Sequence, residues 1–376
     1  MRVRETPALP FMKKIRLGFI GTGFTRLIQI PAFQMFPDEV EVVSIASGSL
    51  ENAEKTAHDF NIPHFTADWC ETIARDDIDL ISIVTPPYLH KEMTLAALAA
   101  GKHVLCEKPT AMTAGEARAM LEKAREKKLL AVIDHELRFL NGRRKAFDMI
   151  RNGELGTINH MKVWFRNASR GHESVKWNWW SDIERGGGAL GAIGSHAVDT
   201  LRWFSGAEVS EVFCLLNTNF KERLDESTGA KRAVTSDDEA NLILKMADGE
   251  FTRDTSALVS ISVTEAGKYG HRTEIYGDKG GLMIEDGGEI LFAKITDHDW
   301  REIAVELGEV PPGSKVGGWS RGFLNFAREI KNALLEGRTE IPHAADFTDG
   351  YRNQVVLDAA RESNASGCFV KVQHTI

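Results

Sequence analysis

Apolar runs typical of buried strands alternate with helical segments through residues 14–134, and this alternation restricts the fold more than any other feature. Residues 14–20 open the series as a buried strand, and residues 50–60 show the 3.6-residue apolar spacing of an amphipathic helix. Such alternation predicts a doubly wound parallel sheet with right-handed connections. Ligands of these sheets bind beyond the carboxyl ends of the strands, so the turns there are the first place to look for a site. The predicted strands span residues 14–20, 40–47, 78–84, 104–105 and 129–134, and the predicted helices span residues 25–35, 50–60, 90–100 and 114–127.

The pattern changes near residue 136. After a predicted helix at residues 143–151, strands and turn residues follow one another with few helices between them, which predicts a large, mostly antiparallel sheet. We therefore expect two α/β domains, residues 13–136 and residues 137–376, with a helix at 347–363 that can pack back on the first domain. The other predicted elements of the second part are strands at residues 160–166, 211–216, 239–246, 256–264, 271–276 and 369–372 and a helix at 320–336.

Length and charge exclude several classes of function. A chain of 376 residues can build two cores, and a net charge of -8 disfavours nucleic acid or an anionic membrane as a partner. No apolar stretch is long enough to cross a bilayer. The four cysteines are scattered without a Cys-x-x-Cys pair, so we expect no disulfide framework, no metal site and a cytoplasmic location.

A glycine turn follows the first predicted strand. In dinucleotide-binding turns the first glycine, here Gly21, makes the tight turn, and the second, Gly23, lets a pyrophosphate approach the backbone. Phe24 and Thr25 then begin a helix whose N-terminus can face the phosphates. Arg26 replaces the usual third glycine, which either sets the helix further from the strand or brings a guanidinium toward phosphate. Two glycines alone are weak evidence of a nucleotide site, but the strand–helix series strengthens it.

Two further turns belong to the predicted cofactor site. The second strand ends at Ser47 with neither the acidic residue that binds a ribose hydroxyl nor an arginine for a 2′-phosphate. Because a small hydroxyl does not repel phosphate, NADP is slightly favoured over NAD, and both stay open. Thr85 and Pro86 end the third strand where a cofactor would lie, although a plain strand-ending turn accounts equally well for the prolines.

The tetrapeptide that ends the fourth strand carries the chemistry. Lys108 lies between Glu107 and Pro109, in a turn that the proline fixes. A lysine held beside a nicotinamide could orient a substrate hydroxyl and stabilise the charge that develops on its oxygen. Together with the glycine turn, this predicts a redox enzyme.

His196 and Asp199 form a second candidate pair after a glycine-rich segment at residues 186–194. Residues three apart share a helix face, so Asp199 could fix the ring or tautomer of His196 and leave the other nitrogen for proton transfer. A surface or capping pair is the common alternative for His-x-x-Asp on a helix.

Aromatic and basic residues complete the candidate substrate site. Trp177 and Trp180 lie in a polar segment and could stack on the CH face of a sugar ring, although large aromatic residues as often pack a core. Arg138 follows the fifth strand and by topology faces the same cleft. An interdomain salt bridge is the equal alternative for Arg138.

With these residues in hand, the chain resembles the Gfo/Idh/MocA oxidoreductases, named after glucose–fructose oxidoreductase and inositol dehydrogenase. It also resembles the branch called glucose–fructose oxidoreductase domain-containing proteins, through segments such as residues 137–140 and 235–238. The resemblance runs from Ile15 to the C-terminus and is densest at residues 18–23, 100–109, 186–199 and 349–360.

This resemblance implies a Rossmann domain followed by a domain with a large open sheet, which in the family commonly serves as an oligomer interface, hence a homodimer or homotetramer. It also implies hydride transfer between NAD or NADP and a hydroxyl-bearing carbon of a sugar, cyclitol or related polyol. By position, Lys108 would orient substrate and cofactor, and His196 would be the acid–base. Residues implied to line the cofactor are Thr85, Pro86, His90 and Glu107.

One departure from the family pattern keeps alternatives open. Many members have an aspartate four residues before the histidine, where this chain has Ala192. Asp199, Lys108 or water could supply the missing polar function. The alternatives to a dehydrogenase are a redox-neutral, NAD-dependent enzyme that cleaves glycosides and a non-catalytic nucleotide-binding protein.

Overall fold

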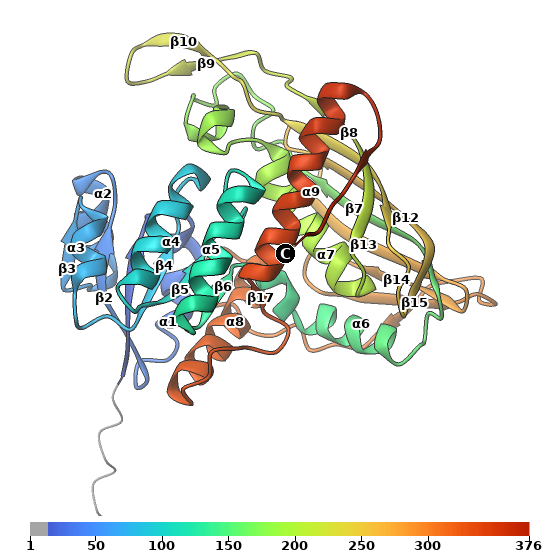
Figure 1. Cartoon of the computed structure of the whole chain (residues 1–376), viewed down its shortest axis with the longest axis horizontal. Coiled ribbons are helices and arrows are strands. Elements are labelled where there is room, and N and C mark those ends of the chain that lie inside the picture. The colour runs from blue at the N-terminus through green and yellow to red at the C-terminus, as the bar shows by residue number, and fades with distance from the viewer. Residues whose placement is uncertain (1–13, 376) are drawn as a thin grey trace, which may run out of the picture.

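A computed structural model describes residues 14–375, whose strands form a seven-stranded sheet, a nine-stranded sheet and a two-stranded hairpin (Figure 1). In the seven-stranded sheet, β1 to β6 run parallel, and β17 pairs antiparallel with β6 at one edge. The strand order is β17-β6-β5-β4-β1-β2-β3. Successive strands are added on one side of β1 up to β3 and then on its other side from β4 to β6, as in a doubly wound sheet. The strands are β1 (Ile15–Ile20), β2 (Val40–Ala46), β3 (His64–Thr66), β4 (Leu80–Ile83), β5 (His103–Cys106), β6 (Ala131–Ile133) and β17 (Ala345–Asp346).

Helices cover both faces of this sheet because its strands are apolar on both sides. One face packs against α1, α2 and the late helix α8, and the other packs against α3, α4, α5 and α9. The helical segment after β1 covers residues 23–33, with a π-helical turn at Thr25–Gln29 before α1, so the predicted first helix is irregular and begins and ends two residues earlier than expected. The helices are α1 (Ile30–Phe33), α2 (Leu50–Phe60), α3 (Trp69–Ala74), α4 (His90–Ala99), α5 (Ala114–Lys127), α8 (Gly318–Leu335) and α9 (Phe347–Ser366).

The nine-stranded sheet has the order β16-β15-β14-β13-β7-β12-β11-β8-β18 and is antiparallel except where β7 pairs with β12. The helices α6 (Asn141–Arg151) and α7 (Ser195–Ser205) belong to the core on one side of it. The hairpin of β9 (Glu222–Asp225) and β10 (Ala230–Ala233) extends from the top of the molecule in Figure 1. The remaining strands are β7 (Ile158–Arg166), β8 (Val209–Asn217), β11 (Glu239–Met246), β12 (Thr252–Ser262), β13 (Gly270–Gly277), β14 (Gly280–Ile284), β15 (Ile290–Lys294), β16 (Arg301–Ile303) and β18 (Val370–Lys371).

The end of the chain returns to the first sheet. Helix α9, red in Figure 1, lies against α5, where the Ala114 amide donates to Asp358 Oδ2 at 2.7 Å. A Cβ at Gly350 would lie 2.4 Å from Thr110 Oγ1, so glycine is what lets α9 approach the turn after β5 this closely. Within residues 14–375 no helix has the length and apolarity needed to cross a membrane.

Candidate active site

A cavity of 610 Å³ opens at the carboxyl ends of β1, β2, β4 and β5. The turns that follow these strands form one wall, and the segment before α7 forms the opposite wall. The lining residues are Ile20, Gly21, Thr22, Gly23, Phe24, Ser47, Gly48, Ala67, Trp69, Val84, Thr85, Pro86, Pro87, Tyr88, Leu89, Met93, Glu107, Lys108, Pro109, Trp179, Trp180, Gly186 and Ala192. The structure thus brings together Gly21, Gly23, Phe24, Ser47, Thr85, Pro86, Glu107, Lys108 and Trp180 of the predicted site.

The glycine turn fits a dinucleotide. Gly21 has φ +104°, and a Cβ there would lie 2.1 Å from the Val84 carbonyl oxygen, so only glycine allows β1 and β4 to end side by side. At Gly23 an added Cβ would meet no protein atom within 4 Å, which leaves the backbone open toward the cavity. These residues are those expected to receive the pyrophosphate of NAD.

Two predicted cofactor residues support the cavity from behind instead of lining it. Thr25 is buried, and its hydroxyl donates to the Gly21 carbonyl at 2.7 Å. His90 is also buried, with Nδ1 3.0 Å from the Pro109 oxygen and Nε2 2.8 Å from the Thr85 oxygen. His90 thus does not line the cavity itself, and its ring ties the turn after β4 to the turn after β5.

Lys108 crosses from one wall of the cavity to the other. Its Nζ donates to the Ala192 carbonyl oxygen at 3.0 Å, although the two residues are 84 positions apart. Since the contact uses the backbone of residue 192, it does not depend on a polar side chain there. The ammonium group therefore lies between the turn of the parallel sheet and the segment that leads into α7.

His196 comes four residues after Ala192, and its side chain is buried outside the cavity lining. Its Nδ1 is 3.4 Å from His135 Nδ1, and its ring contacts Trp319 at a centroid distance of 4.9 Å. Its Nε2 is buried without a hydrogen-bond partner among residues 14–375. Burial, and then the nearby charge of Lys108, hold the pKa of His196 well below its usual value, so the ring is neutral near pH 7.

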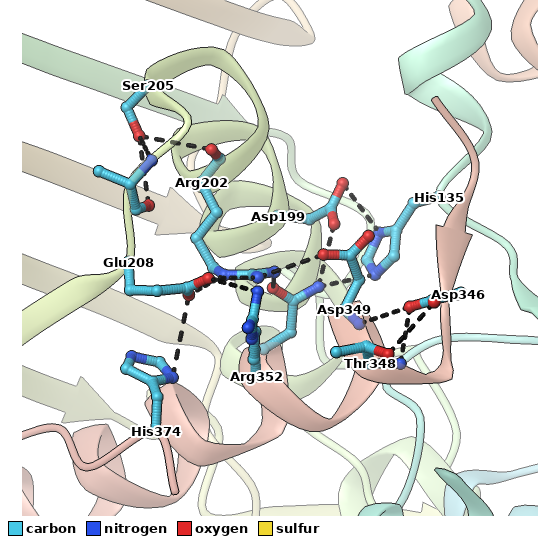
Figure 2. A network of polar contacts seen from close by, with 12 residues as sticks. His135, Asp199, Arg202, Ser205, Glu208, Asp346, Thr348, Asp349, Arg352 and His374 are labelled. Carbon is cyan, nitrogen blue, oxygen red and sulfur yellow. Dashed lines mark hydrogen bonds and ion pairs between the residues drawn. The ribbon is translucent and has the colours of Figure 1, made fainter. Parts of the chain in front are cut away.

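Asp199 serves Arg138 instead of His196, which corrects the predicted direct contact. Figure 2 shows Asp199 beside His135, whose Nδ1 is 3.8 Å from Asp199 Oδ2. The Arg138 guanidinium donates to both oxygens of Asp199, at 2.8 and 2.6 Å, and also to Asp349 at 3.1 Å. Burial alone would raise the pKa of Asp199, but Arg138 and His135 outweigh it and hold that pKa below its usual range. Arg138 thus forms the salt bridge that was the alternative to substrate binding, between the end of the first sheet, α7 and α9.

The tryptophan segment divides between two roles. Trp179 and Trp180 line the cavity, whereas Trp177 lies outside it. The Trp177 ring lies under Arg232, whose guanidinium carbon is 3.5 Å from the ring centroid, and its Nε1 donates to the Ala233 oxygen. Trp177 therefore packs against the β9–β10 hairpin, which is the alternative to its predicted substrate role.

Comparison with known proteins identifies the family. A protein-family model described as "Oxidoreductase family, NAD-binding Rossmann fold" matches residues 15–135, and one described as "GFO/IDH/MocA C-terminal domain" matches residues 143–283. The chain belongs to the GFO/IDH/MocA oxidoreductase family. This confirms the resemblance and the predicted combination of a Rossmann-type parallel sheet with a mostly antiparallel nine-stranded sheet.

Relatives of known structure or name cover nearly the whole chain. An uncharacterized oxidoreductase (sll0816) of Synechocystis sp. is 32% identical over 95% of this chain and 96% of its own length. The levoglucosan dehydrogenase of Pseudarthrobacter phenanthrenivorans is 29% identical over 96% and 99%. A solved structure of levoglucosan dehydrogenase with NADH and L-sorbose superposes with a TM-score of 0.85 at 26% identity, covering 96% and 99% of the two chains. The chain is thus an NAD-binding oxidoreductase whose distant relatives act on sugars, and the lean toward NADP gains no support.

Some GFO/IDH/MocA site features were not predicted from the sequence. Trp69 lines the cavity at the start of α3, after a three-residue strand and with no motif around it. Tyr88 also lines the cavity, and its place in the proline turn after β4 was a signal that could have been used. His135 directly follows the fifth predicted strand, so its place at a carboxyl end was a signal that could have been used. Asn353 has no such signal, because its contacts come from residues far away in the sequence. No group of three or more His, Cys, Asp or Glu residues in the described part of the chain could hold a metal ion.

Three buried carboxyl groups lie under the Lys108 turn. Gln29 donates to Glu107 Oε1 at 3.0 Å and to Asp134 Oδ2 at 2.8 Å, and it accepts from Ser82 at 2.6 Å. Neither oxygen of Glu136 has a hydrogen-bond partner among the described residues. Burial, and then the neighbouring carboxylate of Glu107, raise the pKa of Glu136 well above its usual value. The turn that holds Lys108 therefore rests on buried carboxyl groups whose pKa values are raised by burial.

Glu136→Gln is expected to stabilise the protein more at about pH 8 than at about pH 4. Folding raises the pKa of this carboxyl, so as the pH rises the unfolded chain releases the proton before the folded chain does. The free energy of unfolding therefore falls with pH between the pKa of the unfolded state and that of the folded state. Glutamine does not titrate, so it avoids this loss, which amounts to about 1.4 kcal/mol of unfolding free energy for each pH unit between the two pKa values. Urea unfolding at both pH values measures the difference, with the exposed Glu54→Gln as control. An equal change at both pH values would contradict the assignment.

Proposed function

We propose that this protein catalyses reversible transfer of hydride between NAD and a hydroxyl-bearing carbon of a sugar, cyclitol or related polyol. The observation that carries the proposal is the position of Lys108, whose side chain reaches across the cavity to the Ala192 oxygen. The glycine turn lies on one wall of this cavity, and Trp179 and Trp180 lie on the other. A cavity of 610 Å³ lies within the size range of small-molecule sites. The proposal takes the NADH and sugar complexes of levoglucosan dehydrogenase as support for the class of ligand.

The chain's own residues suggest how the reaction is arranged. Gly21, Gly23, Ser47, Thr85 and Glu107 would hold the cofactor, which when bound supplies the acceptor or donor of the hydride. Lys108 would bind the substrate oxygen and stabilise the charge that develops on it. His196 is proposed as the second group at that oxygen, because its Nε2 is buried and lacks a protein partner among the described residues.

The test is an absorbance assay for reduced nicotinamide with purified protein and a panel of sugars, cyclitols, sugar acids and anhydrosugars. NAD+ and NADP+ are supplied separately, which also decides between the two cofactors. Substrate-dependent reduction supports the proposal. Glycoside cleavage without net reduction, by protein that retains NAD through purification, would replace the dehydrogenase with the redox-neutral enzyme. Cofactor binding with neither nicotinamide reduction nor glycoside cleavage would identify the chain as a non-catalytic nucleotide-binding protein.

Trp179→Ala is expected to raise the KM for the sugar about tenfold, because an indole on the cavity wall can stack on a sugar ring. Trp177→Ala is the matched control: it removes the same side chain two residues away, outside the cavity. KM values and melting temperatures of both variants measure the effect. Equal KM changes in the two variants would show that Trp179 has no contact with substrate.

The assembly and location complete the proposal. Leu215, Ile243 and Leu258 are large apolar residues on the adjacent strands β8, β11 and β12, and each is at least 42% exposed. We propose that this face of the nine-stranded sheet pairs with another copy in a homodimer or homotetramer, which light scattering coupled to gel filtration would measure. Four cysteines without a disulfide suit a cytoplasmic location.

A further inference from the structure

A chain of hydrogen bonds fixes the amide of Asn353. Arg202 Nη1 lies 2.8 Å from Asn353 Oδ1, and since a guanidinium can only donate, the amide oxygen must face Arg202. The amide nitrogen then faces the opposite way, toward Asp199 Oδ1 at 3.0 Å and His135 Nε2 at 3.2 Å. Asn353, Arg202 and Asp199 are all buried, so water does not compete for these positions.

The Asn353 amide in turn fixes the tautomer of His135. Because the amide nitrogen donates, His135 Nε2 must accept and carries no proton. Burial lowers the pKa of His135 to about 4, which keeps the ring neutral and leaves its single proton on Nδ1. That nitrogen faces Asp199 Oδ2 at 3.8 Å and His196 Nδ1 at 3.4 Å, and both can accept a proton.

The same reasoning extends to His196. If His135 Nδ1 carries a proton, His196 Nδ1 must accept, because two N–H groups 3.4 Å apart would repel each other. Burial disfavours a second proton on the His196 ring, and so do the nearby Lys108, His135, His271 and Arg143. The one proton of the neutral ring is therefore on Nε2, the atom that has no partner among residues 14–375.

We propose that Asn353 and His135 are positioning residues that hold His196 with its proton on Nε2, so that His196 donates a hydrogen bond to the reacting oxygen and Lys108 exchanges the proton. This assignment rests on the proposed dehydrogenase function and changes the role that family resemblance gave to His196. In the reductive direction, the carbon–oxygen double bond becomes a single bond as a hydride adds to the carbon, and the oxygen takes a proton from the Lys108 ammonium, which becomes an amine. The oxidative direction is the reverse of this step. His196 cannot supply this proton, because giving up the one on Nε2 would leave an imidazolate.

The arrangement also accounts for Ala192. In relatives with an aspartate four residues before the histidine, a carboxylate precedes the ring on the same segment. Here the group that contacts His196 comes from elsewhere, since His135 follows β6 and is itself oriented by Asn353 on α9. The polar partner of His196 is thus supplied by the end of the parallel sheet.

Neutron diffraction from deuterated crystals of the protein tests the tautomers directly and needs no substrate. We expect deuterium on Nε2 of His196 and on Nδ1 of His135. Deuterium on Nδ1 of His196, or on Nε2 of His135, would overturn the proposal. The positions of the deuterium atoms test the tautomers even if the protein turns over no sugar. In that case the proposed function would fail, but the tautomer assignment would still be tested.

Kinetics of His135 variants test the consequence for turnover. His135→Leu removes the donor, and we expect kcat to fall by about 10- to 100-fold, the usual loss for a supporting hydrogen bond, with little change in KM. His135→Asn can place an amide N–H where Nδ1 lies, so it should recover most of the turnover that His135→Leu loses. Asn353→Leu should act as His135→Leu does, and the double variant should be no worse than either one. Equal losses in His135→Leu and His135→Asn would reduce His135 to a packing role and contradict the proposal.

Discussion

Lys108→Ala is expected to lower kcat/KM by about 10²- to 10⁴-fold, the range for loss of a group that transfers a proton at the reacting oxygen. NAD affinity should change little, because the glycine turn and the end of β2 form the rest of the cofactor wall without Lys108. Stopped-flow or steady-state assays on the best substrate measure the rate, and fluorescence titration measures NAD binding.

Two other variants separate the explanations of a Lys108 effect. Lys91→Ala removes a partly exposed lysine of α4 that pairs with Glu116 at 3.6 Å, and it should leave both rate and affinity unchanged. Lys108→Arg keeps a positive charge but cannot release a proton near neutral pH, so it should be nearly as impaired as Lys108→Ala. Wild-type rates in Lys108→Ala would remove this residue from the reaction altogether.

Asp199→Ala is expected to lower the free energy of unfolding by about 3–5 kcal/mol, because it leaves Arg138 buried without its bidentate partner. The Arg138 side chain is 5% exposed and that of Asp199 is 3% exposed, so water cannot replace the lost contact. Asp349, at 3.1 Å, would then be the carboxylate that still contacts the guanidinium. Urea unfolding monitored by tryptophan fluorescence measures the change.

The matched control is another ion pair of the same length. Arg26 and Asp59 also lie 2.6 Å apart, but their side chains are 29% and 36% exposed. Asp59→Ala should therefore cost about 1 kcal/mol or less, since exposed pairs contribute little. If the two variants lost equal stability, burial of the Arg138 pair would not be the reason for its strength.

Local sequence is sufficient to predict a site residue where that residue acts through its position directly after a strand. Gly21, Ser47, Thr85 and Lys108 all follow strands of a parallel sheet, and because the carboxyl ends of such strands meet at one edge, strand order alone predicts the cavity that these residues share. The three-residue strand β3 escapes prediction because it is too short for a periodic pattern.

Local sequence is not sufficient where the contact partner is distant along the chain. Spacing predicts that Asp199 faces His196, but Arg138 lies 61 residues earlier and binds both oxygens of that carboxylate. No local pattern encodes this pairing, because it depends on how α7, α9 and the first sheet meet.

The return of α8 and α9 to the first sheet has a consequence for synthesis on the ribosome. One apolar face of the parallel sheet is completed by Phe323, Phe326 and Ile330 of α8, and the other by Phe347 and Tyr351 of α9. All strands from β1 to β6 emerge long before these residues are translated. Both faces of the parallel sheet therefore remain partly exposed on the nascent chain, until the last segment to be synthesised covers their apolar residues.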